Sequence, residues 1–308
     1  MTQDATRIRS RKEADGVVTL IVDGSGLGKA EREALYERLE AAELAAGVRE
    51  VRIAMTSAKV GRTLIAIGSG KGGVGKSTVS ANLAVALAKM GKRVGLIDAD
   101  IYGPSQPRLL GTDARPEARE KTLIPVIAQG VRLLSVGQLV PAGQALAWRG
   151  PMAAGALAQL IDGDWGDTEI IIVDLPPGTG DVQLSLVQKA RPAAAVIVST
   201  PQDLALMDAE RAIDLFAKTG VPVIGLIENM AGYACPHCGT SSDPFGSGGA
   251  EAAAARLGIP FLGRLPLSAS LREASDAGRP PAGEDGAAGA AFAALAVAML
   301  AQLEKVAR

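Results

Sequence analysis

The glycine-rich segment 70–78 has the residue types and spacing with the clearest chemistry. Residues 70–77, GKGGVGKS, fit the pattern G-x-x-x-x-G-K-[ST], in which backbone N–H groups converge on phosphate oxygens. We expect Lys76 to reach the β- and γ-phosphates, Ser77 to ligate Mg²⁺ through its hydroxyl, and Thr78 to contact the α-phosphate. The other positions expected in this site are Gly70, Lys71, Gly72, Gly73, Val74 and Gly75. The segment therefore predicts an ATP site of the P-loop type.

A second lysine, Lys71, stands at the start of this loop, where an ordinary P-loop does not need one. The loop resembles the deviant Walker A class, in which that lysine reaches across a dimer interface to the partner's nucleotide. Stabilising transition-state charge in trans is elsewhere the role of an arginine finger, which contributes roughly 10³–10⁵ in rate. We therefore predict a catalytic role for Lys71 alongside Lys76.

Three aspartates follow apolar runs that read as buried strands. Asp174 ends the run IIIVD, the Walker B arrangement, in which the carboxylate holds Mg²⁺ through water. Asp98 and Asp100 follow the run 93–97. Because the carboxyl ends of parallel strands converge on the ligand, we expect these carboxylates to face the γ-phosphate. We assign Asp100 to the attacking water and Asp98 to the Mg²⁺ shell.

The only two cysteines of the chain, Cys235 and Cys238, lie in the sequence CPHC. Such a pair suits a redox dithiol, half of a zinc site or half of a cluster site. Two thiolates cannot complete a tetrahedral shell, whereas a twofold dimer supplies four. Four thiolates suit either a [4Fe–4S] cluster or Zn²⁺, and the motif does not choose between them. The single histidine, His237, is interpreted as a spacer between the ligands.

The hydrophobic pattern after residue 62 predicts the strands and helices that position these residues. Near-continuous Val/Ile runs alternate with helical stretches, which predicts an α/β fold: a mostly parallel sheet covered by helices on both faces. The expected strands are 64–68, 93–97, 131–136, 170–173, 195–198, 223–227 and 261–265. The expected helices include 78–90, 153–161, 204–218 and 286–308. Two long segments, 112–122 and 229–249, interrupt the pattern as loops.

The N-terminal part of the chain has a different hydrophobic pattern. Residues 1–15 are polar and are predicted to form a loose tail. Residues 16–58 contain two apolar runs flanking a helical stretch, which predicts a small βαβ domain. We therefore divide the chain into a tail 1–15, a small domain 16–58 and an ATPase domain 62–308.

Composition limits the function classes. With 32 Lys+Arg against 33 Asp+Glu, the net charge is −1, which offers no global field for nucleic acid or anionic lipid. No uninterrupted apolar run reaches the roughly 18 residues that a membrane span needs, and no secretory signal precedes the first domain. Two neighbouring thiols form no disulfide framework. We expect a cytoplasmic protein that binds neither nucleic acid nor membrane.

Taken together, these segments resemble the Mrp/ApbC iron–sulfur cluster carriers, within the deviant Walker A, MinD/ParA-like ATPases. The matching segments are GSGKGGVGKST, LIDADIYGPSQPRLLG, WRGPM, IIIVDLPPGTGDVQLSL, ENM followed by CPHC, and FLGRLPL with REASDAGRPP, between about residues 62 and 283. The resemblance implies a homodimer that binds ATP in each protomer, holds a labile [4Fe–4S] cluster between two CPHC motifs and passes it to apo-proteins. It makes Cys235 and Cys238 the cluster ligands and Asn229 an adenine contact. Residues 16–58 resemble the later part of a small domain fused ahead of such ATPases, truncated here.

Other functions compete with this interpretation. A positioning ATPase of the MinD/ParA kind would share Lys71, Lys76 and Asp100 but has no use for a CPHC pair. An electron-transferring reductase of the nitrogenase iron-protein kind would have its cysteines widely separated. A P-loop dimer bridged by zinc, with no cluster role, is a further alternative.

Overall fold

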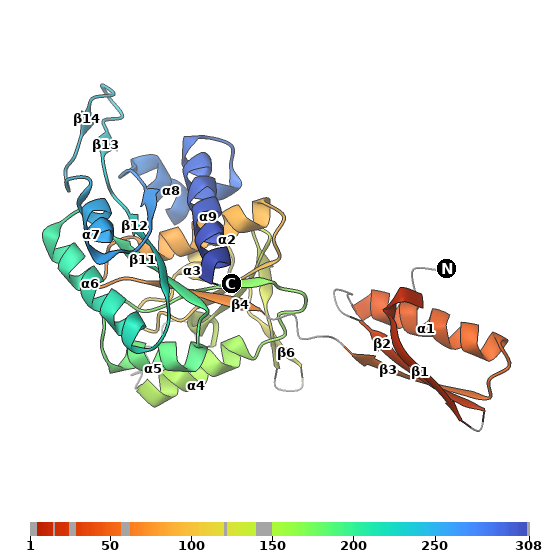
Figure 1. Cartoon of the computed structure of the whole chain (residues 1–308). Helices are drawn as coiled ribbons and strands as arrows, with labels where there is room; N and C mark the ends of the chain where they lie inside the picture. Colours follow the sequence, from red (N-terminus) through yellow and green to blue (C-terminus); the bar gives the residue numbers. More distant parts are fainter. Residues whose placement is uncertain are drawn as a thin grey trace. The chain divides into compact units, whose positions relative to one another are not determined.

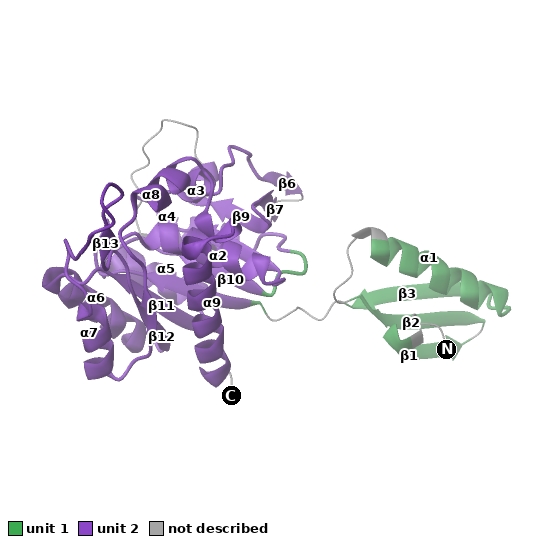
Figure 2. Ribbon diagram, turned by 90° about the horizontal axis from the view of Figure 1, so that it is seen from above, with its two compact units in different colours: residues 1–62, 166–169 green, residues 63–165, 170–308 purple. Residues whose placement is uncertain are grey.

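The computed structural model describes residues 5–14, 16–24, 29–56, 62–119, 122–139 and 150–306. The chain divides into two compact units, residues 1–62 with 166–169 and residues 63–165 with 170–308 (Figure 2). Each unit is described by itself.

The larger unit is built on an eight-stranded sheet in the order β15-β12-β11-β4-β10-β5-β9-β8 (Figure 1). Every neighbouring pair runs parallel except β8 and β9, which are antiparallel. This confirms the predicted mostly parallel sheet. Its strands are β4 (Thr63–Gly68), β5 (Val94–Asp98), β8 (Val126–Ala128), β9 (Val131–Ser135), β10 (Ile170–Asp174), β11 (Ala194–Ser199), β12 (Val223–Glu228) and β15 (Phe261–Arg264).

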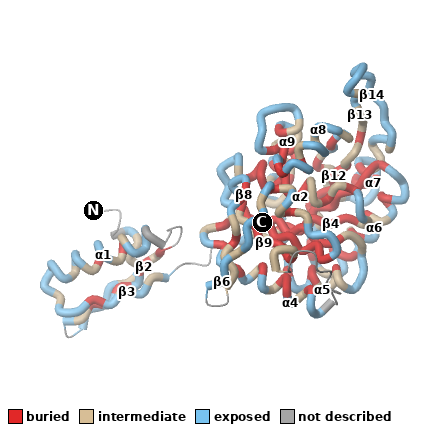
Figure 3. The backbone as a smooth tube through the Cα atoms, turned by 180° about the vertical axis from the view of Figure 1, so that it is seen from behind, coloured by how far each residue is buried: buried red, intermediate tan, exposed pale blue. Residues whose placement is uncertain are grey.

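Alternate residues of the central strands pack into two separate cores, one on each face of the sheet. In β10, Ile170 and Ile172 join the core that contains α2 and α9, whereas Ile171 and Val173 join the core that contains α4, α5, α6 and α7. Both sets are buried, which explains why these strands read as continuous apolar runs (Figure 3). The helices are α2 (Lys76–Lys89), α3 (Gln106–Leu109), α4 (Gly150–Ile161), α5 (Asp181–Ala190), α6 (Asp203–Lys218), α7 (Gly249–Leu257), α8 (Ala269–Asp276) and α9 (Ala287–Val306), with short 3₁₀ turns η2 (Val136–Leu139) and η3 (Pro281–Gly283).

Helix α9 is long and apolar enough to cross a membrane by length and composition. In the structure it packs on α2 and on strands β12 and β15. Its residues Phe292, Leu295 and Met299 are almost fully buried in the core on that face of the sheet. One face of helix α9 therefore belongs to the core of the larger unit, and 22% of its apolar stretch is buried.

The two predicted loops of the larger unit contain short hairpins. The first holds β6 (Glu117–Arg119) paired with β7 (Thr122–Ile124), and the second holds β13 (Tyr233–Ala234) paired with β14 (Ser241–Ser242). The second hairpin projects from the body of the unit (Figure 1). Its outer part is exposed (Figure 3).

The small unit is a three-stranded sheet, β1 (Ile8–Ala14), β2 (Val17–Asp23) and β3 (Glu50–Thr56), with helix α1 (Lys29–Ala45) between β2 and β3 and a 3₁₀ turn η1 (Ala5–Arg7) before β1. Strands β2 and β3 are parallel, as a βαβ unit requires. The core of this unit is small: Val18, Leu20, Val22, Leu35, Leu39 and Val51.

Strand β1 corrects the prediction that residues 1–15 form a loose tail. Ile8–Ala14 pairs antiparallel with β2. The strand carries charges instead of an apolar alternation, and its two arginines are paired: Arg9 contacts Asp23, and Arg11 contacts Glu43 of α1. A charged edge strand of this kind lacks the hydrophobic pattern by which strands are recognised. Residues 1–4, 15 and 57–61 lie outside the described part of the chain.

Candidate nucleotide and cysteine sites

The P-loop connects the end of β4 to the start of α2. Gly75 is the N-cap of α2, so the positive end of the helix dipole faces the loop. The loop forms one wall of a hollow of about 190 Å³, which is also lined by Asp100 and Pro177. A hollow with this wall suits a bound phosphate chain.

The first and last glycines of the motif are required by close contacts. A Cβ on Gly70 would lie 2.0 Å from the backbone carbonyl carbon of Asp208 in α6. A Cβ on Gly75 would lie 2.1 Å from Nδ2 of Asn229, and the φ of Gly75 is +84°. Any other residue at either position would displace its neighbours, which explains the spacing of the two glycines in structural terms.

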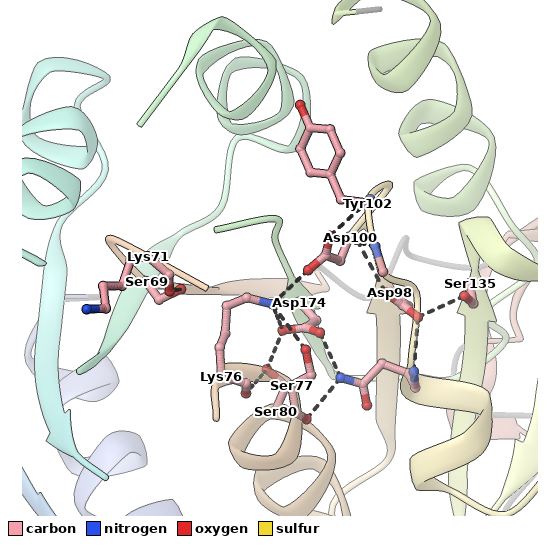
Figure 4. A network of polar contacts seen from close by, with 12 residues as sticks. Ser69, Lys71, Lys76, Ser77, Ser80, Asp98, Asp100, Tyr102, Ser135 and Asp174 are labelled. Atoms are coloured by element: carbon pink, nitrogen blue, oxygen red, sulfur yellow. Dashed lines mark hydrogen bonds and ion pairs between the residues drawn. The ribbon is translucent and has the colours of Figure 1, made fainter. Parts of the chain in front are cut away.

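Lys76, which lines this hollow, contacts the carboxylates of Asp174 and Asp100. Nζ of Lys76 lies 2.7 Å from Oδ1 of Asp174 and 3.6 Å from Oδ2 of Asp100 (Figure 4). The side chain of Lys76 is 5% exposed and that of Asp174 is fully buried. The structure thus brings together three residues that the sequence predicts to act on one phosphate, although they come from three different segments.

Asp174 is held by two further side chains that the sequence analysis missed. Oγ of Ser80 lies 2.8 Å from Oδ1 of Asp174, and Nε2 of Gln106 donates to Oδ2 at 2.8 Å. Ser80 follows Lys76 by one helical turn, so the helix period could have placed it on the same face. No sequence pattern identified Gln106, because its contact depends on the path of the chain between β5 and α3.

Asp98 lies behind this hollow and is fully buried. Its Oδ2 accepts from the backbone N–H of Gln106 at 3.0 Å and from the hydroxyl of Ser135 at 2.9 Å. Burial, and then the charge of Asp174, raise the pKa of Asp98 to about 7. These contacts fix the loop after β5. The predicted place of Asp98 in the Mg²⁺ shell stays a prediction.

Asp100 lies at the surface of the hollow. Its Oδ1 accepts the backbone N–H groups of Tyr102 and Gly103 at 3.2 and 3.3 Å, and its Oδ2 faces Lys76. A carboxylate held by its own loop and turned toward the phosphate site can orient a water molecule. This geometry suits the predicted role of Asp100.

The side chain of Lys71 points away from Lys76 and Asp174 (Figure 4). The hydroxyl of Ser69 donates to the backbone oxygen of Lys71 at 3.1 Å, which fixes the turn that presents this lysine. Lys71 is therefore presented outward at the rim of the hollow that it lines. Its predicted action on a partner's nucleotide stays a prediction.

A second cavity of about 240 Å³ adjoins the P-loop at Gly75 and Thr78. Apolar side chains, among them Val79, Leu265 and Phe292, line much of it, and Asn229 stands at the P-loop end. Nδ2 of Asn229 donates to the backbone oxygen of Val74 at 2.8 Å. An apolar cavity that begins at the end of a phosphate loop is suited to a flat aromatic base.

The cysteine pair lies in the turn of the β13–β14 hairpin. The backbone N–H of Cys235 donates to Thr240 at 3.0 Å, and the N–H of Gly239 donates to Cys235 at 2.8 Å, so the turn is closed by its own backbone. Cys235 is half-buried, Cys238 is exposed, and both are free thiols. The hydroxyl and then the N–H of Thr240 lower the pKa of Cys238, which favours the thiolate that binds metals.

Among the described residues, no group of three or more His, Cys, Asp or Glu side chains is arranged to hold a metal ion. The cysteine pair therefore needs donors from outside its own hairpin to complete a tetrahedral shell. Trp148 and Arg149 of the WRGPM segment lie outside the described residues.

The chain is similar in sequence to a known family and to named proteins. The family model described as ParA, NUBPL iron-transfer P-loop NTPase, matches residues 60–300. An iron–sulfur cluster carrier protein of Deinococcus radiodurans is 51% identical over 248 residues, which cover 76% of this chain and 70% of the relative. A mitochondrial iron–sulfur protein required for NADH dehydrogenase in Arabidopsis thaliana is 50% identical over 222 residues, 71% of either chain.

Among solved structures, a nucleotide-binding protein of Archaeoglobus fulgidus in complex with ADP is similar to this chain. It is 40% identical, with a TM-score of 0.64, and the match covers 72% of this chain and 89% of that one. The resemblance inferred from the sequence is confirmed. The chain belongs to the ParA family of P-loop NTPases, as one of the NUBPL iron-transfer type.

Proposed function

We propose that this protein is an ATP-hydrolysing carrier that holds a [4Fe–4S] cluster between the cysteine pairs of two protomers and passes it to apo-proteins. The observation that carries the proposal is the pair of free thiols, half-buried Cys235 and exposed Cys238, which the β13–β14 hairpin presents in the same unit as the nucleotide site. Relatives at about half identity are named iron–sulfur cluster carriers, which supports iron over zinc as the metal.

The nucleotide site supports hydrolysis of ATP. Backbone N–H groups of the P-loop and Lys76 bind the phosphates, and the apolar cavity beside Asn229 receives the base. Ser77 and Asp174 supply the oxygen donors that suit Mg²⁺, which would neutralise charge on the β- and γ-phosphates when bound. Asp100 orients the attacking water, and Lys71 acts on the nucleotide of the other protomer.

Two hairpins that face each other across a twofold axis supply four thiolates for one cluster. Exposure of Cys238 suits a cargo that must leave again, because a carrier has to release what it binds. The proposed recipients are apo iron–sulfur proteins. We therefore propose a homodimer as the form that carries the cluster.

A continuous series of contacts links the nucleotide site to the cysteine hairpin. Asn229 donates to Val74 in the P-loop, and the next residue, Met230, has a φ of +60°, which is uncommon for a side chain of its size. Ala231 then donates to Leu265, beside the apolar cavity, at 2.9 Å. A base that enters this cavity meets the segment leading directly into the hairpin. We propose that this segment couples the nucleotide to cluster release.

The segment that carries the cysteines is also held at its C-terminal end by a residue of strand β12. Both carboxylate oxygens of the buried Glu228 accept backbone N–H groups, from Gly248 at 2.9 Å and Ala250 at 2.7 Å. Glu228 directly precedes Asn229, so both ends of the segment that carries the cysteines are held at the end of β12. A displacement there moves the hairpin as a whole.

Anaerobic reconstitution with iron and sulfide tests the proposal. The protein should bind about four irons per dimer and gain visible absorption. Cys235→Ala should lose both while it still binds ATP, whereas His237→Ala, a change between the two ligands, should keep both. Zinc alone, or iron retained in Cys235→Ala, would contradict the cluster assignment. An iron-free ATPase would favour a positioning function of the MinD/ParA kind.

A further inference from the structure

Gln106, the first residue of α3, makes an unusual set of contacts at the nucleotide site. Its side chain is fully buried. Nε2 donates to Oδ2 of Asp174 at 2.8 Å and lies 3.0 Å from the backbone oxygen of Ser77. The same residue donates its backbone N–H to Asp98. One glutamine therefore touches both residues that supply the proposed Mg²⁺ donors.

The orientation of this amide is fixed by its neighbours. Asp174 Oδ2 and the Ser77 carbonyl oxygen are both acceptors, so only the amide nitrogen can face them. The amide oxygen, Oε1, is then left buried without a hydrogen-bond partner. A buried acceptor of this kind is commonly satisfied by a water molecule.

We propose that Gln106 is a positioning residue of the magnesium site. Its Nε2 holds Asp174 against the Ser77 end of the P-loop, so that the two residues that would supply oxygen donors to Mg²⁺ keep their places. This inference rests on the proposed function, since it needs a nucleotide with its magnesium.

The residues present fit Mg²⁺ and its water. Mg²⁺ prefers oxygen donors and keeps several waters when one or two protein groups and the phosphates bind it. Partners one step removed from a metal typically change its affinity about 10- to 100-fold when they are lost.

Gln106→Met tests the inference, because methionine has a similar length but neither donor nor acceptor. ADP serves as the probe, since it is not hydrolysed, and its binding is measured by calorimetry in EDTA and across a magnesium titration. We expect unchanged ADP affinity in EDTA and a magnesium midpoint raised roughly tenfold or more. Gln106→Asn, which is too short to reach both partners, should raise the midpoint as well and serves if the methionine variant does not fold.

The matched control is Gln183→Met in α5, which makes the same change at another buried glutamine. Within the described part of the chain, both polar atoms of the Gln183 amide lack a partner, and Gln183 is not among the residues that line the phosphate hollow. It should leave the midpoint unchanged. An unchanged midpoint in Gln106→Met, or an equal loss of ADP affinity in EDTA, would overturn the inference. A wild-type protein that binds ADP without any response to magnesium would instead refute the proposed magnesium site, and the inference with it.

Discussion

Replacing Lys76 by methionine should destabilise the protein as well as abolish hydrolysis. Lys76 is the only cation that hydrogen-bonds to the buried Asp174 in the described residues, and the pair is almost fully removed from water. Loss of one partner from a buried ion pair costs about 3–5 kcal/mol, because the remaining charge stays buried. Ser80 and Gln106 still hydrogen-bond to Asp174, which places the expected cost near the lower end, at about 3 kcal/mol.

This cost can be measured by thermal unfolding. For a unit of this size, each kcal/mol lowers Tm by about 2–4 °C, so Lys76→Met should melt roughly 6–12 °C below the wild type. Lys89→Met is the matched control, since Lys89 lies on the same helix and pairs with Asp285 at the surface. An exposed pair is screened by water and contributes little, so this control should melt close to the wild type.

A double variant separates stability from catalysis. Lys76→Met with Asp174→Asn removes both charges and should regain most of the lost stability, while hydrolysis remains abolished. Equal melting temperatures for Lys76→Met and Lys89→Met would refute the argument that Asp174 is a buried charge dependent on Lys76. So would a double variant that is no more stable than Lys76→Met.

Two further variants test other contacts. Asn229→Ala removes the predicted adenine contact beside the apolar cavity, a hydrogen bond worth about 0.5–1.5 kcal/mol, so ATP should bind about two- to tenfold more weakly in calorimetry; unchanged affinity would place Asn229 outside the nucleotide site. Glu43→Gln breaks the pair with Arg11 and should weaken amide protection of β1 only slightly in hydrogen exchange, because an exposed pair contributes little in water. Because Arg11 lowers the pKa of Glu43, this pair stabilises the fold above the ordinary glutamate pKa and its contribution is lost as the pH falls through the lowered value; a difference that grows in acid would contradict the assignment.

The sheet of the larger unit could be predicted from the sequence because burial on both faces leaves a direct pattern. The strand predicted at 170–173 is Ile170–Asp174 in the structure, and the extra residue is the carboxylate itself, which still pairs with both neighbouring strands. Helix α2 begins at Lys76, two residues before the predicted start, because the helix N-terminus is part of the phosphate loop. The P-loop motif and the strand Ile170–Asp174 therefore place Lys76 and Asp174, the two residues at the centre of the nucleotide site.

Other parts of the structure leave no such pattern. Strand β1 is charged throughout most of its length and is held by ion pairs to residues distant in the sequence. Gln106 meets Asp174 only because the loop after β5 folds back over the end of β10. Contacts that depend on the path of a loop have no spacing by which a sequence can reveal them.

Cluster transfer tests the central claim most directly. The reconstituted protein is mixed anaerobically with an apo-enzyme that needs a [4Fe–4S] cluster, in the presence of an iron chelator, and recovery of that enzyme's activity is followed with and without MgATP. We expect recovery from the wild type, at a rate that responds to MgATP, and no recovery from Cys238→Ala. No recovery from the wild type, or equal recovery from Cys238→Ala, would contradict it.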